Sequence, residues 1–235
     1  MNAITPLTKE IHAHLKLATN NRYPQVKAEH LLPVVVHEFT TLALEYPIVF
    51  VKNAESGAFQ SVVLTGIKPG QNLYYSEQGW QAHVAPAVVR NYPLLLIQDP
   101  ADEQQLLVGI NEQSELLNAS EGELLFNADG SESAFLQRRK QALADFLKQT
   151  QVTAAFVAEL LELGLLVPQK LTLTVNQQKQ ELNGLYLVDE NKLNALDETA
   201  FNSLRKRGML APLYAHLMSL RNIERLIKKA VGQGS

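Results

Sequence analysis

The chain has 235 residues, of which 46% are hydrophobic and 19% are charged, and its formal net charge is −3 at pH 7. This length and composition predict a folded protein with one large core or two smaller ones, and they exclude low-complexity disorder for most of the chain. The chain has no cysteine, which excludes thiol catalysis, cysteine-ligated zinc, iron–sulfur clusters and disulfides. Nothing in the composition suggests an oxidising compartment, and we expect a cytoplasmic protein.

Membrane insertion is not expected. The first residues lack the basic and apolar regions of a secretory signal. Glu38 and Glu45 interrupt the most apolar region, so no uncharged apolar run approaches the roughly 18 residues of a spanning helix. The sequence therefore excludes a permease.

The charges are distributed unevenly along the chain. No Lys or Arg lies between Arg90 and Arg138, and the nine acids of that stretch are Asp99, Asp102, Glu103, Glu112, Glu115, Glu121, Glu123, Asp129 and Glu132. From residue 205 onward seven bases face one acid, Glu224; the bases are Arg205, Lys206, Arg207, Arg221, Arg225, Lys228 and Lys229. Either the two segments meet or are solvated, or the basic end binds an anionic partner.

Residues 1–30 are polar and irregular, which predicts an extended arm lying on a sheet. His12 and His14 alternate with apolar residues in this arm. Two histidines at this spacing could hold a metal from a strand, but no third ligand is near in the sequence. The spacing favours a solvated edge over a metal site.

The stretch 35–50 predicts a helix that continues into a strand. Val35, Phe39, Leu42 and Tyr46 recur with helical spacing and mark a buried face. Pro47 ends the helix, and residues 48–50 read as an apolar strand. The opposite helical face carries Glu38, Thr41 and Glu45, whose two carboxylates are available for another role.

Further strands are predicted at 59–66, after a turn at 53–57, and at 72–75. Trp80 is the only tryptophan and is typical of a core residue whose indole N–H is satisfied locally, with ligand stacking as the alternative. A crossing loop with one helical turn follows to Pro93.

A hairpin is then predicted from residues 94–97 and 105–110, with an exposed acidic tip. Asp129-Gly130 marks a soft boundary between a mainly β half, 1–130, and a mainly helical half, 131–235, which together we expect to form one compact unit.

The second half predicts two successive helices, the first capped by Ser131 or Ser133 and the second restarting near residue 150 and ending at Gly164. Strict alternation predicts a β-hairpin from residues 171–175 and 185–188. Asp189 and Asp197 are typical N-caps.

The last helix is predicted to start at Pro212. Its apolar face contains His216, which suits a satisfied core histidine better than a ligand or base, and Arg221 and Arg225 lie on a neighbouring face. These patterns together predict an α+β fold: an antiparallel-rich sheet formed by the strands of residues 46–110, with helices packed on it, plus a β-hairpin and C-terminal helices.

Local patterns along nearly the whole chain resemble the SapC-like family of bacterial proteins. They are His12-x-x-Leu15-x-Leu17, Glu38-Phe39, Tyr46-Pro-Ile-Val-Phe50, Asn72-Leu73, Gly79-Trp80, Tyr92-Pro93, Gly184-Leu185, Val188-Asp-Glu190 and Tyr214-Ala-His216-x-x-Ser219-Leu-x-Asn222. None is a catalytic signature, and the resemblance depends on their order and spacing. It implies genomic neighbours that encode tryptophan-halogenase-like enzymes, cupin-like oxygenases and TonB-dependent receptors, and it identifies no reaction.

The leading functional hypothesis is a binding or assembly protein that assists modification or uptake of a peptide or small molecule. Its expected binding residues are Glu38, Glu45, Tyr46, Asn72, Trp80 and His216. The alternatives are an enzyme that uses Glu38, Glu45, His37 or His216 as acid, base or metal ligand, and a surface-layer-associated protein. A protein or peptide partner and self-association are expected, whereas nucleic acid is not, because the basic end lacks interleaved aromatic residues. The sequence identifies no cofactor.

Overall fold

The computed structural model describes residues 4–20 and 22–232. Contacts divide the chain into two compact units, each drawn from two stretches: unit 1 comprises Met1–Gln25 and Ala87–Lys148, and unit 2 comprises Val26–Pro86 and Gln149–Ser235. Helices and antiparallel strands make up both units, which confirms the predicted α+β class. The expected division of the chain at residue 130, into a mainly β half and a mainly helical half, stays a prediction.

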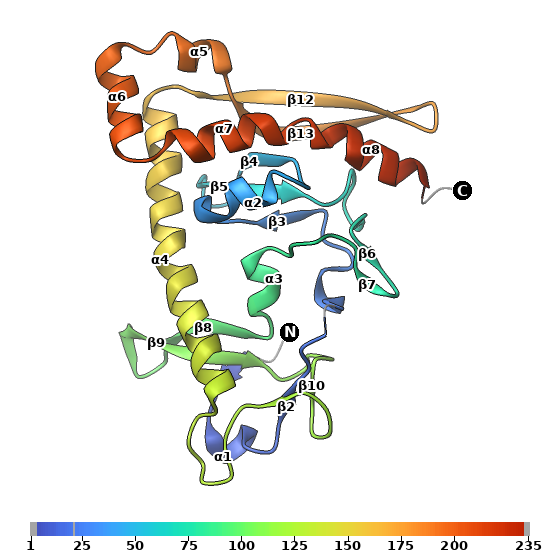
Figure 1. Cartoon of the computed structure of the whole chain (residues 1–235), viewed down its shortest axis with the longest axis vertical. Coiled ribbons are helices and arrows are strands. Elements are labelled where there is room, and N and C mark those ends of the chain that lie inside the picture. Colours follow the sequence, from blue (N-terminus) through green and yellow to red (C-terminus); the bar gives the residue numbers. More distant parts are fainter. Residues whose placement is uncertain (1–3, 21, 233–235) are drawn as a thin grey trace. The chain divides into compact units, whose positions relative to one another are not determined.

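Unit 2 contains a five-stranded antiparallel sheet of order β12-β13-β4-β5-β3 (Figure 1). Its strands are β3 (Leu31–Pro33), β4 (Ile48–Lys52), β5 (Phe59–Leu64), β12 (Leu166–Val175) and β13 (Gln178–Val188), and a separate hairpin consists of β6 (Tyr75–Ser76) and β7 (Gly79–Trp80). The β12–β13 hairpin confirms the predicted one and is longer, because polar residues that were expected to form its turn continue both strands.

Unit 2 also contains short helices. They are η2 (Val36–Glu38), α2 (Phe39–Leu42), α5 (Glu190–Asn194), α6 (Glu198–Lys206), α7 (Leu210–Ser219) and α8 (Asn222–Gly232), preceded by the short η1 (Pro24–Val26). Helix α7 contacts α2, β4 and β13, and α8 contacts β12 (Figure 1).

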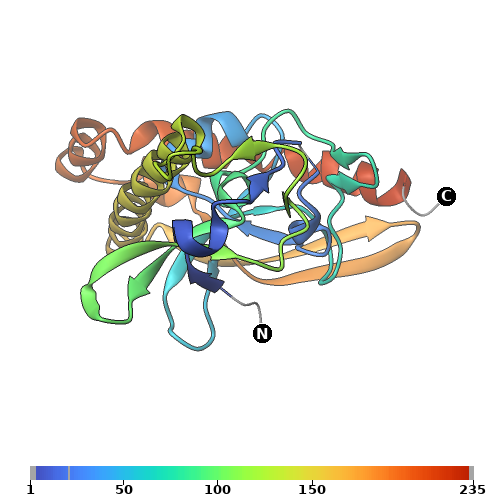
Figure 2. The same cartoon turned by 90° about the horizontal axis from the view of Figure 1, so that it is seen from below.

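Unit 1 contains two small antiparallel sheets, of order β1-β9-β8 and β10-β2-β11 (Figure 2). Its elements are β1 (Ile4–Pro6), α1 (Lys9–His12), β2 (Lys16–Leu17), α3 (Ala87–Asn91), β8 (Leu94–Asp99), β9 (Asp102–Asn111), β10 (Leu117–Asn118) and β11 (Glu123–Leu124). Its core cluster consists of Leu17, Leu94, Ile110, Leu116, Leu125, Phe126, Leu136 and Leu143. Helix α4 (Ala134–Glu162) contributes residues to both units.

The predicted helix-to-strand element is present in unit 2. Val35, Phe39, Leu42 and Tyr46 are all at most 3% exposed, so the apolar face is buried as expected. The helical part starts as a 3-10 turn and becomes α-helical only at Phe39. The helix ends at Leu42, earlier than the predicted end at Pro47, and residues 43–47 form a turn before β4, in which Ile48, Val49 and Phe50 are buried.

Two predictions about strands are wrong. The strands of 46–110 do not form one sheet, because β4 and β5 belong to unit 2 and β8 and β9 to unit 1. Residues 72–74 are not a strand: the Asn72 side-chain oxygen accepts a hydrogen bond from the Tyr74 N–H at 2.9 Å, which holds a turn there.

Two predictions about helices are also wrong. Helix α4 does not break near residue 150. The Thr153 hydroxyl donates a hydrogen bond to the Gln149 carbonyl of the preceding turn, and the helix continues. The last helix starts at Leu210 and breaks at Leu220–Arg221, which gives α7 and α8. Other local signals are confirmed: Ser133 caps α4, Gly164 has a φ of +64° after it, and Asp189 and Asp197 cap α5 and α6.

The N-terminal arm differs from expectation at His12. Its ring is fully buried, and its two nitrogens lie 2.9 Å from the Thr8 carbonyl and 3.1 Å from the Glu112 carboxylate. His14 is exposed. The expectation of a solvated histidine edge is therefore wrong for His12, which ties α1 to the residues after β9.

Candidate functional site

Four of the six predicted binding residues meet in one network of unit 2, in which Tyr46 and Asn72 are buried and Glu45 and Trp80 are half-buried. The Tyr46 hydroxyl donates to the Val84 carbonyl at 2.6 Å and accepts the Trp80 indole N–H at 3.1 Å. The Tyr46 ring centroid lies 4.6 Å from that of Tyr74 and 6.4 Å from that of Trp80. The indole N–H of Trp80 is thus satisfied locally, as the core interpretation of this residue predicts.

Glu45 and Asn72 complete this network. One carboxylate oxygen of Glu45 accepts the backbone N–H groups of His83 and Val84 at 2.9 and 3.2 Å. The Asn72 amide donates to the Val26 carbonyl at 2.8 Å. These side chains therefore hold the 72–85 loop against the end of α2.

Burial dominates the electrostatics of the two tyrosines. It raises the pKa of Tyr46 and of Tyr74 well above the ordinary tyrosine value. Both phenols are therefore protonated at neutral pH and serve as hydrogen-bond donors, Tyr74 to the Glu45 carbonyl at 2.8 Å. Lys229 of α8 places its ammonium group 4.8 Å from the Tyr74 ring centroid, within the range of a cation–π contact.

The fifth residue, His216, lies on α7 and forms a different contact. Its Nδ1 lies 2.8 Å from the Ile48 carbonyl, and its Nε2 lies 3.1 Å from the Val188 N–H. The Nε2 must accept from that N–H, so Nδ1 carries the proton of the neutral ring. Burial lowers the pKa of His216 to about 4, against the opposing effect of the Ile48 carbonyl.

His216, Ser219 and Asn222 act together at intervals of three residues. The Ser219 hydroxyl accepts the Ile48 N–H at 2.9 Å, and the Asn222 amide donates to the Ala43 carbonyl at 2.7 Å. The three side chains thereby satisfy backbone groups of Ala43, Ile48 and Val188. They join the α7–α8 region to the central element and β13.

The sixth residue, Glu38, lies apart from this network. Its carboxylate accepts the Val35 N–H at 3.3 Å, within the same 3-10 turn. Glu38 and Glu45 therefore have different backbone partners, although both follow the helical spacing predicted for them. Within the part of the chain that the structure describes, no three His, Asp or Glu residues are grouped so that they could hold a metal ion.

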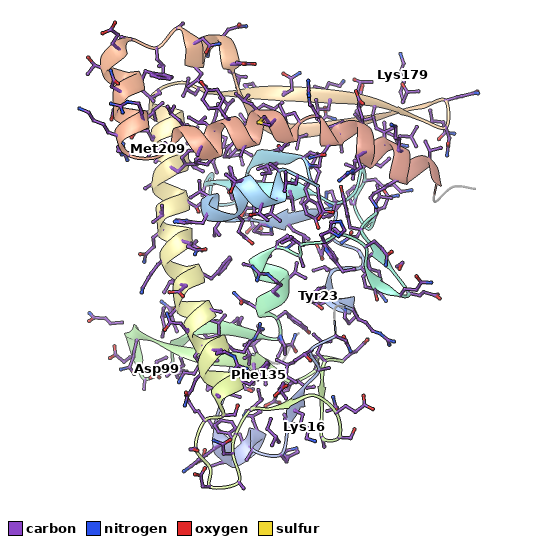
Figure 3. The ribbon with its side chains drawn as sticks, viewed as in Figure 1. Lys16, Tyr23, Asp99, Phe135, Lys179 and Met209 are labelled. Carbon is purple, nitrogen blue, oxygen red and sulfur yellow. The ribbon has the colours of Figure 1, made fainter. Side chains whose placement is uncertain are left out.

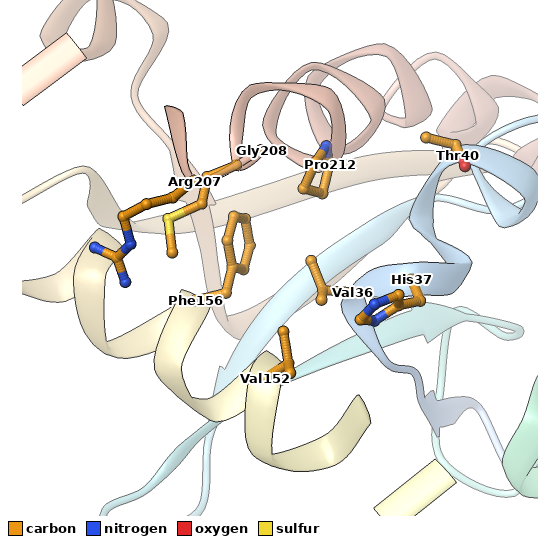
Figure 4. A pocket seen from close by; sticks show the side chains of 9 residues that line it. Val36, His37, Thr40, Val152, Phe156, Arg207, Gly208 and Pro212 are labelled. Atoms are coloured by element: carbon orange, nitrogen blue, oxygen red, sulfur yellow. The ribbon is translucent and has the colours of Figure 1, made fainter. Parts of the chain in front are cut away.

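A cavity of about 260 Å³ opens elsewhere in unit 2 (Figure 4). We call it the α2–α4–α7 cavity. Its lining residues are Val36, His37, Thr40, Val152, Phe156, Arg207, Gly208, Met209 and Pro212. Figure 4 shows Phe156 between Arg207 and His37, and Figure 3 shows Met209 beside α4 at the start of α7.

The polar groups of the cavity lie at its exposed rim. His37, Thr40 and Arg207 are exposed, whereas Val36, Phe156 and Met209 are buried. The Arg207 guanidinium donates to the Glu159 carboxylate through one nitrogen, Nη1, and its other nitrogens donate to no residue within the described part of the chain. The cavity thus combines an apolar base with a cation and two hydrogen-bonding side chains at its edge.

The SapC family model matches residues 7–226. The chain belongs to the SapC family. No curated protein and no solved structure matches it. None of the helices in the described ranges, 4–20 and 22–232, is both long and apolar enough to cross a membrane.

The positions that carry the SapC resemblance are mainly scaffold. Phe39, Tyr46 and Phe50 are buried core residues, and His12, Asn72, His216 and Ser219 are buried polar residues with hydrogen-bond partners. The cavity lining contains none of the quoted family positions. Among its residues, the sequence singled out only His37 as a possible acid, base or metal ligand, since three distant segments supply the lining.

The contacts of the two carboxylates predict unequal effects of neutralisation. Glu45→Gln should lower the free energy of unfolding by about 1–2 kcal/mol, because one amide oxygen replaces a charged acceptor that serves two backbone N–H groups. Glu38→Gln should cost less, because an amide oxygen can still accept the Val35 N–H, whose bond to Glu38 is long at 3.3 Å. Urea unfolding of both variants, with exposed Glu77→Gln as the control, measures this. A larger loss for Glu38→Gln would contradict the assignment.

Proposed function

We propose that this SapC-family chain is a binding protein whose ligand occupies the α2–α4–α7 cavity. The observation that supports this is the cavity itself, because an apolar concave surface with a few polar groups at its rim is the usual form of a small-molecule site. Its volume suits an aromatic or branched aliphatic group. The guanidinium of Arg207 suits a carboxylate next to that group.

The biological role proposed here is accessory. The ligand is a peptide side chain with a nearby acid group, or a small molecule of the same chemistry, and the chain assists its modification or uptake in the cytoplasm. The proposed setting is the one that the family resemblance implies, beside tryptophan-halogenase-like enzymes and TonB-dependent receptors. Family membership supports this setting, and the cavity supports only the binding step.

The six residues predicted from the sequence to bind a ligand keep that role as a prediction. Their contacts also give each one a place in the scaffold, which is why the cavity carries the proposal instead. The enzymatic alternative draws less support, because Glu38, Glu45 and His216 each accept a backbone N–H and do not converge on one another.

Two probes test the cavity: indole-3-propionate, and its methyl ester as the uncharged match. We expect saturable NMR shifts of cavity residues with the acid, and weaker ones with the ester. Val152→Trp should abolish both, because Val152 lines the cavity and its side chain is 49% exposed, so that the larger ring can enter the opening. Arg207→Gln should weaken binding of the acid at least threefold and leave the ester unchanged.

The matched control is Leu161→Trp, which adds the same ring to an exposed position of α4 outside the cavity. It should bind both probes as the unmodified chain does. Equal binding by Val152→Trp, or no saturable shift at about 10 mM of either probe, would overturn the proposal.

A further inference from the structure

One face of unit 2 exposes apolar and basic side chains together. Leu44 is 72% exposed and Met218 is 70% exposed. Helices α7 and α8 follow one another along this face (Figure 1). We call it the basic face; its residues are Leu44, Tyr214, Met218, Arg221, Arg225 and Lys228, all exposed.

Helical spacing and hydrogen bonds bring residues of this face close together. Tyr214 and Met218 are one helical turn apart on α7. The Arg221 N–H donates to the Met218 carbonyl at 3.3 Å, and the Arg225 guanidinium donates to the Leu44 carbonyl at 3.3 Å. The exposed leucine therefore lies next to a cation of α8.

The cations of this face have no acidic partner among the residues that the structure describes: Arg221, Arg225 and Lys228 form no ion pair there. The one acid of α8 is Glu224, which is exposed. Three cations and one acid leave the face with an excess of positive charge, next to apolar surface that water covers.

Unit 1 carries a face of opposite character around β10 and β11. Glu115, Glu121, Glu123 and Leu124 are exposed there, Leu124 by 44%. These acids form no ion pair with any residue in the described ranges. The nearest base in the sheet is Lys16, which is paired with Leu124 in register and donates to the Ser120 carbonyl at 2.9 Å. We call these four residues the acidic face.

We propose that the basic face of one copy of the chain docks on the acidic face of a second copy. The two faces are complementary: the basic face combines exposed apolar side chains with cations, and the acidic face combines the exposed Leu124 with acids. Apolar contact of Leu44 and Met218 with Leu124 removes surface from water, while the charges around it orient the encounter. Because the two faces differ, the contact is heterologous and joins copies head to tail.

Sedimentation of the whole chain tests this. At about 100 μM chain in about 25 mM salt the average mass should exceed that of one copy, and it should return to one copy in about 500 mM salt, where the Debye length falls to about 4 Å. Arg221→Glu with Arg225→Glu should remove the association, as should Glu121→Gln with Glu123→Gln. The control, Arg205→Glu with Lys206→Glu, makes the same charge change on exposed residues of α6 and should behave as the unmodified chain.

Mixing the two interface variants gives the sharper result. Each retains the face that the other lacks, so a 1:1 mixture should form dimers although each variant alone is monomeric. The mixture should stop at two copies, because the remaining basic face is reversed and the remaining acidic face is neutral. A chain that stays monomeric at low salt, or a mixture that stays monomeric while both variants remain folded by circular dichroism, would overturn the proposal and leave the basic face for another anionic partner.

Discussion

Lowering the pH from 7 toward 4 should destabilise the protein by up to roughly 3 kcal/mol through His216 alone. The buried imidazole has a pKa of about 4 in the folded state, against about 6.5 in the unfolded chain. Between these values the unfolded state binds a proton that the folded state does not, so the free energy of unfolding rises with pH across this window. The contribution is complete above about pH 6.5 and is lost as the pH approaches 4.

His216→Gln isolates this contribution. Glutamine does not titrate, and its amide can donate to the Ile48 carbonyl and accept the Val188 N–H, which are the two bonds of the neutral ring. Urea unfolding at pH 7, 6, 5 and 4.5 should show the histidine chain losing stability faster than the variant. The difference between the two chains is the measurement, since carboxylates titrate in both. A difference that does not change with pH would contradict a neutral, satisfied His216.

Local patterns predicted the elements well. The face of the central element, the two hairpins and the caps at Asp189 and Asp197 all follow from side-chain periodicity or from a side chain that bonds its own backbone. Each of these signals acts over a few residues, where the chain itself fixes the geometry. The α+β class follows from the same signals.

Long-range bonding explains the errors. The break between α7 and α8 lies where Ser219 and Asn222 turn to backbone groups of Ile48 and Ala43, more than 170 residues earlier. Thr153 was expected to belong to the start of a new helix. Instead it lies inside α4, and its hydroxyl accepts the Val36 N–H. Neither partner is adjacent in sequence, so periodicity alone misplaced both helix boundaries.

The same contrast between local patterns and long-range contacts holds for the candidate site. Tyr46, Asn72 and Trp80 were singled out because they belong to a family pattern, and they meet because that pattern includes a buried network. The cavity depends on Val152 and Arg207, which carry no motif and lie on segments that meet only in the folded chain. Sequence patterns therefore found the scaffold and missed the concave surface beside it.

Removing the ring of Phe39 should produce the largest loss of stability in unit 2. Phe39 is fully buried, with its ring centroid 6.3 Å from that of Phe50 and 6.0 Å from that of Phe156, in the second case edge to face. It therefore joins α2, β4 and α4. Phe39→Ala should lower the free energy of unfolding by about 3–5 kcal/mol, because it removes both ring contacts and leaves a void.

Urea unfolding measures this loss, and Tyr214→Ala serves as the control. It also removes an aromatic ring, but from a side chain that is 40% exposed, so it should cost well under half as much. Phe39→Leu should recover part of the loss, since it refills much of the void without restoring the edge-to-face contact. A cost below about 1 kcal/mol for Phe39→Ala would contradict the central place of this ring.

Phe39→Ala should also affect the α2–α4–α7 cavity. Phe156 packs against Phe39 and lines this cavity, so a void at Phe39 should loosen the cavity wall and weaken probe binding.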